Sequence, residues 1–220
     1  MTHNKRLPAP KHYPIARKES TYISSIEGSR SKDAAIPAVV LLRDVLGYAE
    51  NEKDAKKIIQ DRNLVRNGEP VTSVRQGIGV LDVVEIPETE ESYRVIRNEN
   101  GLEFISVNEP EKVISKIVGK QKEEEEYVYR LHNGENYRSE DEYSTGNSLI
   151  FNSSVREIKL EEGAKVLVIG GGNAGLTAEL KEIRRQGRNP DIAVVENNGE
   201  QIETLMENLV AVDNIEVGDN

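Results

Sequence analysis

The sequence predicts an α+β fold that is mostly β: a basic, extended N-terminal arm (1–35), a small α/β module (36–86), an antiparallel β domain (87–160) and a small C-terminal β-barrel with a tail (161–220). Three observations predict it. Apolar residues recur at helical spacing only between positions 36 and 60. Alternating apolar runs separated by glycine turns follow them. The first 31 residues contain three prolines and no apolar period.

The charge of the chain is unevenly distributed. The 220 residues carry a net charge of −10. Residues 1–31 hold six lysines and arginines against two glutamates, a net charge of +4, so the rest of the chain carries −14. A basic segment on an acidic body indicates a polyanionic partner, and the added carboxylates would keep the body hydrated in a cytoplasm of high salt.

Composition also excludes several classes of protein. The chain has no cysteine and only three histidines, which argues against disulfides and a zinc site. No apolar run approaches the roughly 20 residues of a membrane helix, and the N-terminus lacks the apolar segment of a signal peptide. The carboxylates at Glu140, Asp141 and Glu142 have no apolar neighbours that would raise a pKa, so we expect no acid–base catalysis there.

The module at Ile36–Ile86 begins with two amphipathic helices. Pro37 suits the first turn of the first helix and Gly47 its end, and Asn51 is placed to cap the second. The apolar faces consist of Leu41, Leu42, Val45, Leu46 and Ala49 in the first helix and Ala55, Ile58 and Ile59 in the second. Three cations, Lys53, Lys56 and Lys57, crowd one side of the second helix, and Asn67-Gly68 predicts a β-hairpin after it.

These residues resemble the small RNA-binding module shared by ribosomal protein S-four and its relatives. The resemblance lies in Arg43-Asp44, Gly47, Ala55–Ile59 and Val65–Gly68. The chain departs from that pattern at Asn51-Glu52-Lys53, where the family has Ser-Arg, and at Asn63, where it has glycine.

The N-terminal arm carries a second resemblance. The run Lys5-Arg6-Leu7-x-Ala9-Pro10-Lys11-His12-x-x-Ile15-x-Arg17-Lys18 is similar to the opening of the archaeal and eukaryotic small-subunit ribosomal proteins of the S-four-e family. Cations alternate here with Tyr13 and Tyr22, and such residues contact phosphates and stack on unpaired bases. We expect the arm to be extended, mobile in the free protein and ordered only against RNA.

The next segment predicts a mostly antiparallel β domain. Strands are expected at Tyr93–Ile96, Leu102–Val107, Lys116–Gly119, Tyr127–Leu131 and Ser148–Phe151. Turns are expected at Asn100-Gly101 and Asn133-Gly134. A solvated loop is expected at Glu123–Glu126, because adjacent carboxylates repel one another. The sequence Leu131–Gly134, followed by Asp141–Tyr143, also resembles the central domain of the S-four-e family.

A glycine-rich stretch near the C-terminus allows two interpretations. Gly170, Gly172 and Gly175 follow the apolar run Val166–Ile169 in the pattern G-x-G-x-x-G, and Glu196 lies 21 residues further on, as in a dinucleotide site. That site needs several βα units, which the chain does not offer. We therefore favour a KOW-type, SH3-like barrel in which the glycine loop joins two antiparallel strands, the second at Ala178–Ile183.

Together the resemblances cover nearly the whole chain in the family's order. They imply a cytoplasmic structural constituent of the small ribosomal subunit that binds its rRNA beside neighbouring ribosomal proteins, with no catalysis, cofactor, metal, membrane or small-molecule substrate. The expected RNA-binding residues are Lys5, Arg6, Lys11, His12, Arg17, Lys18, Arg43, Lys53, Lys56, Lys57, Arg66, Gly171, Asn173, Arg184 and Arg185. The alternative is a dinucleotide-dependent oxidoreductase using the Gly170–Gly175 loop. An RNA-modifying enzyme would need a catalytic body for which we expect no room.

Overall fold

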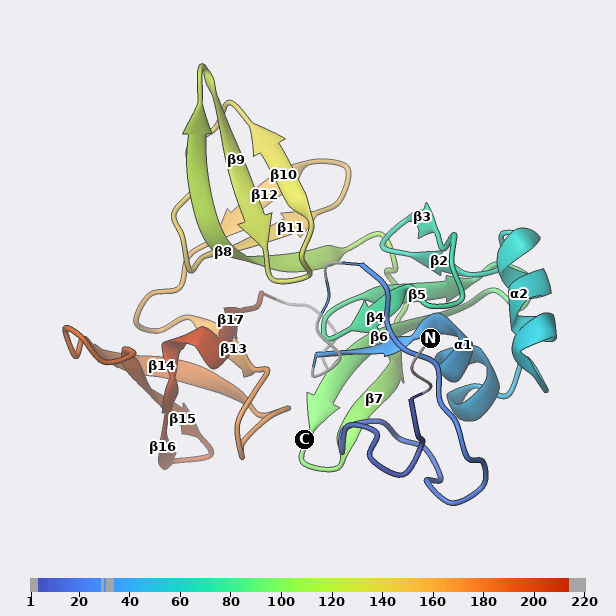
Figure 1. Ribbon diagram of the computed structural model, residues 1–220. Coiled ribbons are helices and arrows are strands. Elements are labelled where there is room, and N and C mark those ends of the chain that lie inside the picture. The colour runs from blue at the N-terminus through green and yellow to red at the C-terminus, as the bar shows by residue number, and fades with distance from the viewer. Residues whose placement is uncertain (1–3, 29, 31–33, 214–220) are drawn as a thin grey trace. The chain divides into compact units, whose positions relative to one another are not determined.

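The computed structural model describes residues 4–28, 30 and 34–213. The chain divides into two compact units, Met1–Ile96 with Asn100–Glu111, and Arg97–Glu99 with Lys112–Asn220. Figure 1 shows that strands dominate both units. They form several antiparallel sheets, which confirms the mostly β fold that the sequence predicts. No helix among the described residues is long and apolar enough to cross a bilayer.

The first unit contains the two expected helices. Its opening elements are β1 (Ala35–Pro37), α1 (Ala38–Val40), the π-helical turn η1 (Leu41–Val45) and α2 (Glu52–Gln60). The first helix departs from α geometry, because Leu46 N–H donates to the carbonyl of Leu41 at 2.9 Å, five residues back. Asn51 caps α2 as predicted, its Oδ1 accepting from the N–H groups of Lys53 and Asp54 at 2.9 and 3.1 Å.

The strands of this unit form two sheets. One pairs β1 with β4 (Gly77–Gly79). The other has the spatial order β3 (Glu69–Pro70), β2 (Val65–Arg66), β5 (Val83–Ile86), β6 (Glu91–Asn98) and β7 (Gly101–Ser106). Asn67 and Gly68 have φ values of 53° and 80°, so the predicted hairpin turn between β2 and β3 is confirmed. The predicted turn at Asn100-Gly101 likewise joins β6 and β7.

A buried carboxylate connects these elements. Asp82 is 1% exposed and accepts from Arg30 Nη2 at 2.5 Å, from Asn67 Nδ2 at 2.9 Å and from the N–H of Gly79 at 2.8 Å. Gly79 has to be glycine, because a Cβ there would lie 2.1 Å from Arg30 Nη1 and 2.6 Å from the carbonyl of Ala34. Three donors therefore satisfy one buried charge and fix the chain around it.

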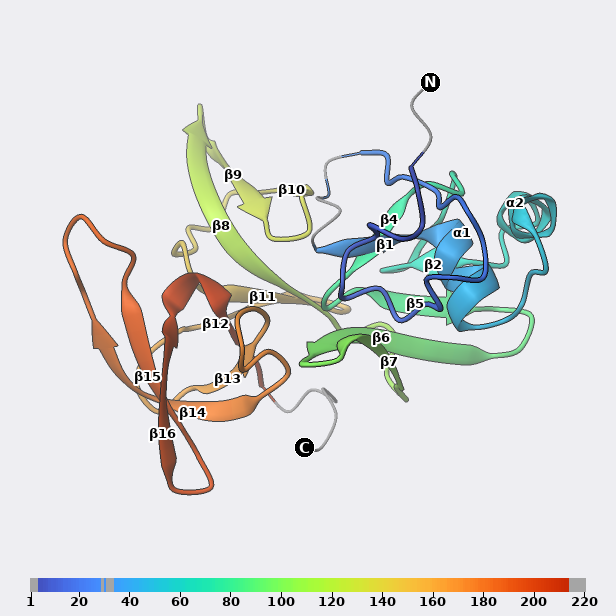
Figure 2. The same ribbon diagram turned by 60° about the horizontal axis from the view of Figure 1, so that its bottom comes forward.

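The N-terminal arm is not extended as the sequence analysis expects. Within the described residues it folds back on itself, with a β-bridge between Lys5 and Tyr22, and Figures 1 and 2 show it looping past α1. It also packs on the β6–β7 turn, where Leu102 N–H donates to the carbonyl of His12 at 2.8 Å. Ala9 and Tyr13 are 7% and 5% exposed. The expectation of an extended arm is wrong, because it was based on the arm's own few apolar residues and not on the surface of the module against which they pack.

The second unit contains two five-stranded antiparallel sheets. The first has the order β10 (Asn136–Ser139), β9 (Glu126–Leu131), β8 (Val113–Glu123), β11 (Ser148–Phe151) and β12 (Val155–Ile158). Figure 2 shows β8 as a long bent strand that pairs with β11 along one half and with β9 along the other. The predicted turn at Asn133-Gly134 is confirmed between β9 and β10. The predicted loop at Glu123–Glu126 is shorter than expected: Glu124 and Glu125 form an exposed tight turn, and Glu123 and Glu126 pair at the ends of the two strands.

The second sheet contains the glycine-rich loop. Its order is β16 (Glu200–Leu205), β15 (Ile192–Asn197), β14 (Thr177–Arg184), β13 (Lys165–Val168) and β17 (Leu209–Ala211), with η2 (Met206–Asn208) before β17. The loop joins β13 to β14, which are antiparallel. Among the described strands β16 and β17 are not paired with each other, so the sheet does not close into a barrel by hydrogen bonds.

This loop contradicts the dinucleotide interpretation. A dinucleotide fingerprint requires a helix after the glycines, whereas residues 177–184 form a strand. The glycines serve close packing instead: a Cβ at Gly170 would lie 2.5 Å from Asn208 Oδ1, and one at Gly175 would lie 2.7 Å from the carbonyl of Arg97. Glu196 lies on β15 opposite Glu179 rather than at a ribose site.

A buried lysine connects the two sheets of the second unit. Lys116 of β8 is 6% exposed, and its ammonium donates to the carbonyls of Met206, Glu207 and Leu209 at 2.8, 3.0 and 2.6 Å. These three bonds use all the donors of an ammonium group. Burial lowers the pKa of Lys116 to about 8, although the Glu207 carboxylate acts in the opposite direction.

We predict that Asp82→Ala lowers the free energy of unfolding by about 3–5 kcal/mol, because it leaves the Arg30 guanidinium buried without its carboxylate. Urea denaturation followed by circular dichroism measures the loss. The control is Glu27→Ala, which removes the exposed ion pair with Arg75 and costs about 1 kcal/mol or less. Equal losses in the two variants would contradict the role given to Asp82.

We predict that Lys116 makes stability depend on pH in the alkaline range. Between pH 8 and its ordinary pKa of 10.5, the folded chain has released this proton while the unfolded chain retains it. The free energy of unfolding contributed by Lys116 therefore rises with pH in this window. Urea titrations of the protein and of Lys116→Met at pH 7, 8, 9 and 10 measure it. We subtract the free energy of unfolding of Lys116→Met from that of the protein. This difference should be constant up to pH 8 and rise above it, and a difference that stays constant up to pH 10 would refute the lowered pKa.

Candidate nucleic-acid interface

The second helix presents an unneutralised cluster of positive charge. Lys53, Lys56 and Lys57 are exposed, and none forms an ion pair with the residues that the structure describes. Helical spacing puts Lys57 one turn after Lys53 and Lys56 beside both. Ala55 and Ile59 are buried on the opposite side and hold the helix to the module. We call Lys53, Lys56 and Lys57 the α2 lysine cluster. Its geometry suits contacts with successive phosphates of a nucleic acid.

Arg43, unlike these lysines, is paired with a carboxylate. It is half-buried, and its Nη2 donates to Asp44 Oδ2 at 2.7 Å. The same carboxylate accepts from Arg6 Nη1 at 3.0 Å. Asp44 thus bridges one arginine of the arm and one of η1, although Arg6 and Asp44 are 38 residues apart. Of the predicted RNA-binding residues in the two helices, Arg43 is therefore already paired with a carboxylate, and the α2 lysine cluster is not.

The predicted contact residues of the arm fall into two groups. Lys5, Lys11 and Lys18 are exposed. Arg6 is 2% exposed and also donates through Nε to the carbonyl of Ala16 at 2.7 Å. His12 is 7% exposed.

Arg17 belongs with the second group. Its guanidinium donates to the carbonyls of Ala9 and Pro10 at 2.5 and 2.9 Å, and so closes the proline-rich turn of the arm. Among these six predicted contact residues, the three lysines are exposed to solvent, whereas Arg6, His12 and Arg17 are buried or half-buried and contribute to folding.

The remaining predicted residues are spread over both units. Arg66 is half-buried and donates to the carbonyl of Gly77 at 2.9 Å. Gly171 and Asn173 are exposed at the tip of the β13–β14 loop. Arg184 forms ion pairs with Glu182 and Glu203 at 2.9 and 2.5 Å, so carboxylates already neutralise it, whereas Arg185 is exposed.

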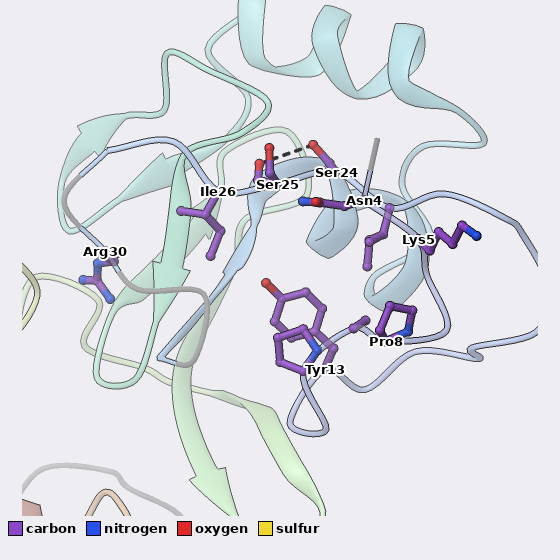
Figure 3. A pocket seen from close by; sticks show the side chains of 11 residues that line it. Asn4, Lys5, Pro8, Tyr13, Ser24, Ser25, Ile26 and Arg30 are labelled. Carbon is purple, nitrogen blue, oxygen red and sulfur yellow. Dashed lines mark hydrogen bonds between the residues drawn. The ribbon is translucent and has the colours of Figure 1, made fainter. Parts of the chain in front are cut away.

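The folded arm encloses a cavity that the sequence does not reveal. Its volume is about 520 Å³. Figure 3 shows the ring of Tyr13 near the centre of the view, with Ser24 and Ser25 above it. The full lining is Asn4, Lys5, Pro8, Ala9, Pro10, Tyr13, Ile23, Ser24, Ser25, Ile26 and Arg30. We call it the arm cavity. The one signal for it in the sequence is the run Thr21-Tyr22-Ile23, whose strand propensity lets it pair back with Asn4–Arg6.

The described residues offer little that resembles a catalytic centre. They contain no group of three or more histidine, aspartate or glutamate side chains that could hold a metal ion. Strongly shifted pKa values often mark active sites, yet the large shift at Lys116 belongs to an ammonium enclosed by three backbone carbonyls. Its role is to join two sheets.

Comparisons with known proteins place the chain beside ribosomal proteins. No protein-family model matches the chain. The small ribosomal subunit protein eS4 of Haloarcula marismortui is 31% identical over 99% of this chain and 98% of its own length. The protein of the same name from Natronomonas pharaonis is 32% identical over 96% and 94%. The crystal structure of the 30S ribosomal protein S4e from Thermoplasma acidophilum covers 82% of this chain and 95% of its own, with a TM-score of 0.69 at 20% identity, and shows the same fold.

Proposed function

Because the chain belongs to the family of small ribosomal subunit proteins named eS4, we propose that it is a structural constituent of the small ribosomal subunit that binds small-subunit rRNA. The observation that carries the proposal is the similarity along nearly the full length of ribosomal relatives. The family is one of ribosomal proteins and not of enzymes. The protein would act in the cytoplasm, where ribosomes work, beside neighbouring ribosomal proteins.

The α2 lysine cluster is the principal RNA contact in this proposal. Its three ammonium groups are exposed and have no carboxylate partner among the described residues, which leaves their charge available to phosphates. Neutralising phosphates releases condensed counterions and supplies most of the sequence-independent affinity. Lys5, Lys11 and Lys18 of the arm add a second set of contacts of the same kind. Net acidity elsewhere in the chain does not oppose this, because screening limits its reach to about 8 Å at physiological salt.

Each segment of the chain takes a separate part. We propose that 1–35 is an RNA-binding arm and 36–86 an S-four-type RNA-binding module. In this proposal 87–160, whose first strands β6 and β7 extend the sheet of the module, forms a central β region that meets neighbouring proteins. The last segment, 161–220, is a KOW-type, SH3-like barrel left open between β16 and β17. Gly171 and Asn173 support an RNA contact at the β13–β14 loop of the last segment. Both are exposed, and the glycines beside Asn173 let the backbone approach RNA closely.

We predict that Lys56→Glu with Lys57→Glu weakens binding to small-subunit rRNA about tenfold or more at 0.1 M salt, since two phosphate contacts become repulsive. Both side chains are exposed, so the melting temperature should change by no more than a few degrees. Filter binding at several salt concentrations measures the affinity. Lys122→Glu with Lys159→Glu makes the same change of charge in the second unit and should leave affinity nearly intact. Unchanged affinity in the first variant would overturn the assignment of the cluster.

For the arm we predict that Lys5→Ala, Lys11→Ala and Lys18→Ala together flatten the log–log salt dependence of rRNA binding by about 2–3, one contact for each exposed ammonium. Arg6→Ala serves as the contrast, because Arg6 is buried against Asp44. It should lower the free energy of unfolding and leave the salt slope unchanged. If the triple variant keeps the original slope, the arm does not contact phosphates.

A further inference from the structure

We propose that the arm cavity receives one unstacked nucleotide of single-stranded RNA, with its base inside and its phosphates outside. The inference deepens the proposed rRNA-binding function and rests on it. The cavity is separate from the α2 lysine cluster: it is lined by residues of the folded arm and by Arg30, and none of its lining residues lies in α2.

The walls of the cavity suit a flat, partly apolar ligand. The Tyr13 ring forms part of the lining together with two proline rings, Pro8 and Pro10, and the side chains of Ile23 and Ile26. Tyr13 is 5% exposed, so little of its ring is open to a ligand, and most of the apolar contact with a base would come from the proline and isoleucine side chains. The volume of about 520 Å³ lies within the range of roughly 300–1,000 Å³ that small-molecule sites occupy.

A few polar groups on the lining could recognise the edge of a base. Asn4 contributes a carboxamide, which both donates and accepts, and neither this group nor the hydroxyl of Ser25 is bound to another side chain among the described residues. Ser24 Oγ has one long bond, to the carbonyl of Ser25 at 3.5 Å. An apolar wall facing a small number of hydrogen-bonding groups is typical of a ligand site.

Arg30 adds one charged side chain to the lining of the cavity. Its side chain is 7% exposed, and its Nη2 is paired with Asp82. Its Nε is buried and has no hydrogen-bond partner among the residues that the structure describes. Guanidinium groups donate hydrogen bonds to the carbonyl oxygens and ring nitrogens of bases.

The charge outside the cavity favours a nucleotide over a neutral ligand. Lys5 lies at the rim, and Figure 3 shows its ammonium pointing away from Tyr13 toward the outside. A phosphate that leaves the cavity would meet this ammonium. The segment that lines the cavity also belongs to the part of the chain with a net charge of +4. A base inside and phosphates outside therefore match both the walls and the rim.

The test fills the cavity without removing a charge. Ser25 is exposed and lines the cavity, so Ser25→Leu should occupy the space of the base. Thr21→Leu, at an exposed position on the same segment that does not line the cavity, is the matched control. The probe is a fluorescent single-stranded octamer of uridine, and anisotropy at several salt concentrations gives its affinity for the full chain. We expect Ser25→Leu to lose about tenfold in affinity, the loss of one stacked base, with an unchanged salt slope, and Thr21→Leu to lose little.

A second measurement locates the base directly. An octamer of 4-thiouridine is crosslinked to the protein by light, and tryptic peptides are analysed by mass spectrometry. We expect adducts on Leu7–Lys11 or His12–Arg17, which carry Pro8, Pro10 and Tyr13, and their loss in Ser25→Leu. The same adducts with rRNA in reconstituted subunits would support the assignment. Adducts on other peptides of the chain, with none on these two, would show that the base lies elsewhere and would refute it.

The outcomes separate this inference from the proposed function. If Lys56→Glu with Lys57→Glu weakens rRNA binding, but Ser25→Leu behaves like Thr21→Leu and no adduct forms on residues 7–17, the nucleotide cavity alone is rejected. If the charge-reversed variant also binds rRNA with unchanged affinity, the proposed RNA contacts fail together with the cavity.

Discussion

One buried carboxylate holds the first compact unit together. Asp82 accepts hydrogen bonds from the backbone of nearby Gly79 and from two side chains further off in the sequence, those of Arg30 and the turn residue Asn67. A single buried charge costs several kcal/mol unless donors surround it, so these segments must meet for the unit to fold. Arg30 also lines the arm cavity, which means that the same contact positions one wall of the proposed nucleotide site.

Short-range patterns predicted most of the strands, turns and helices. Asn67-Gly68, Asn100-Gly101 and Asn133-Gly134 each lie where paired strands are joined, because a glycine that adopts positive φ is a local signal that the sequence displays. Asn51 was identifiable as a cap for the same reason. The glycine-rich loop required a wider view, since its spacing alone fits a dinucleotide site and the absence of following βα units was the deciding observation.

Contacts between distant residues could not be predicted. Composition alone does not distinguish Arg6 from Lys5, yet one is buried against Asp44 and the other is exposed. The choice depends on a carboxylate 38 residues away and on space beneath the arm. Lys116 is a similar case, because its three carbonyl partners lie about 90 residues downstream. In both cases the sequence suggests an exposed charged side chain, but the structure buries it in a contact between segments that are distant in the sequence.

The contact of the arm with the β6–β7 turn has a consequence for the order of folding during synthesis. The carbonyl of His12 accepts from the N–H of Leu102, and Gly101, with φ of 132°, has no Cβ that would collide with His12. His12 is made early, but its partner is made about ninety residues later, on the order of 5–20 s at ordinary rates of translation. The arm can therefore pair with itself and with Asp44 well before its contact with β7 is available, and a polyanion near the nascent chain can meet it before that last contact forms.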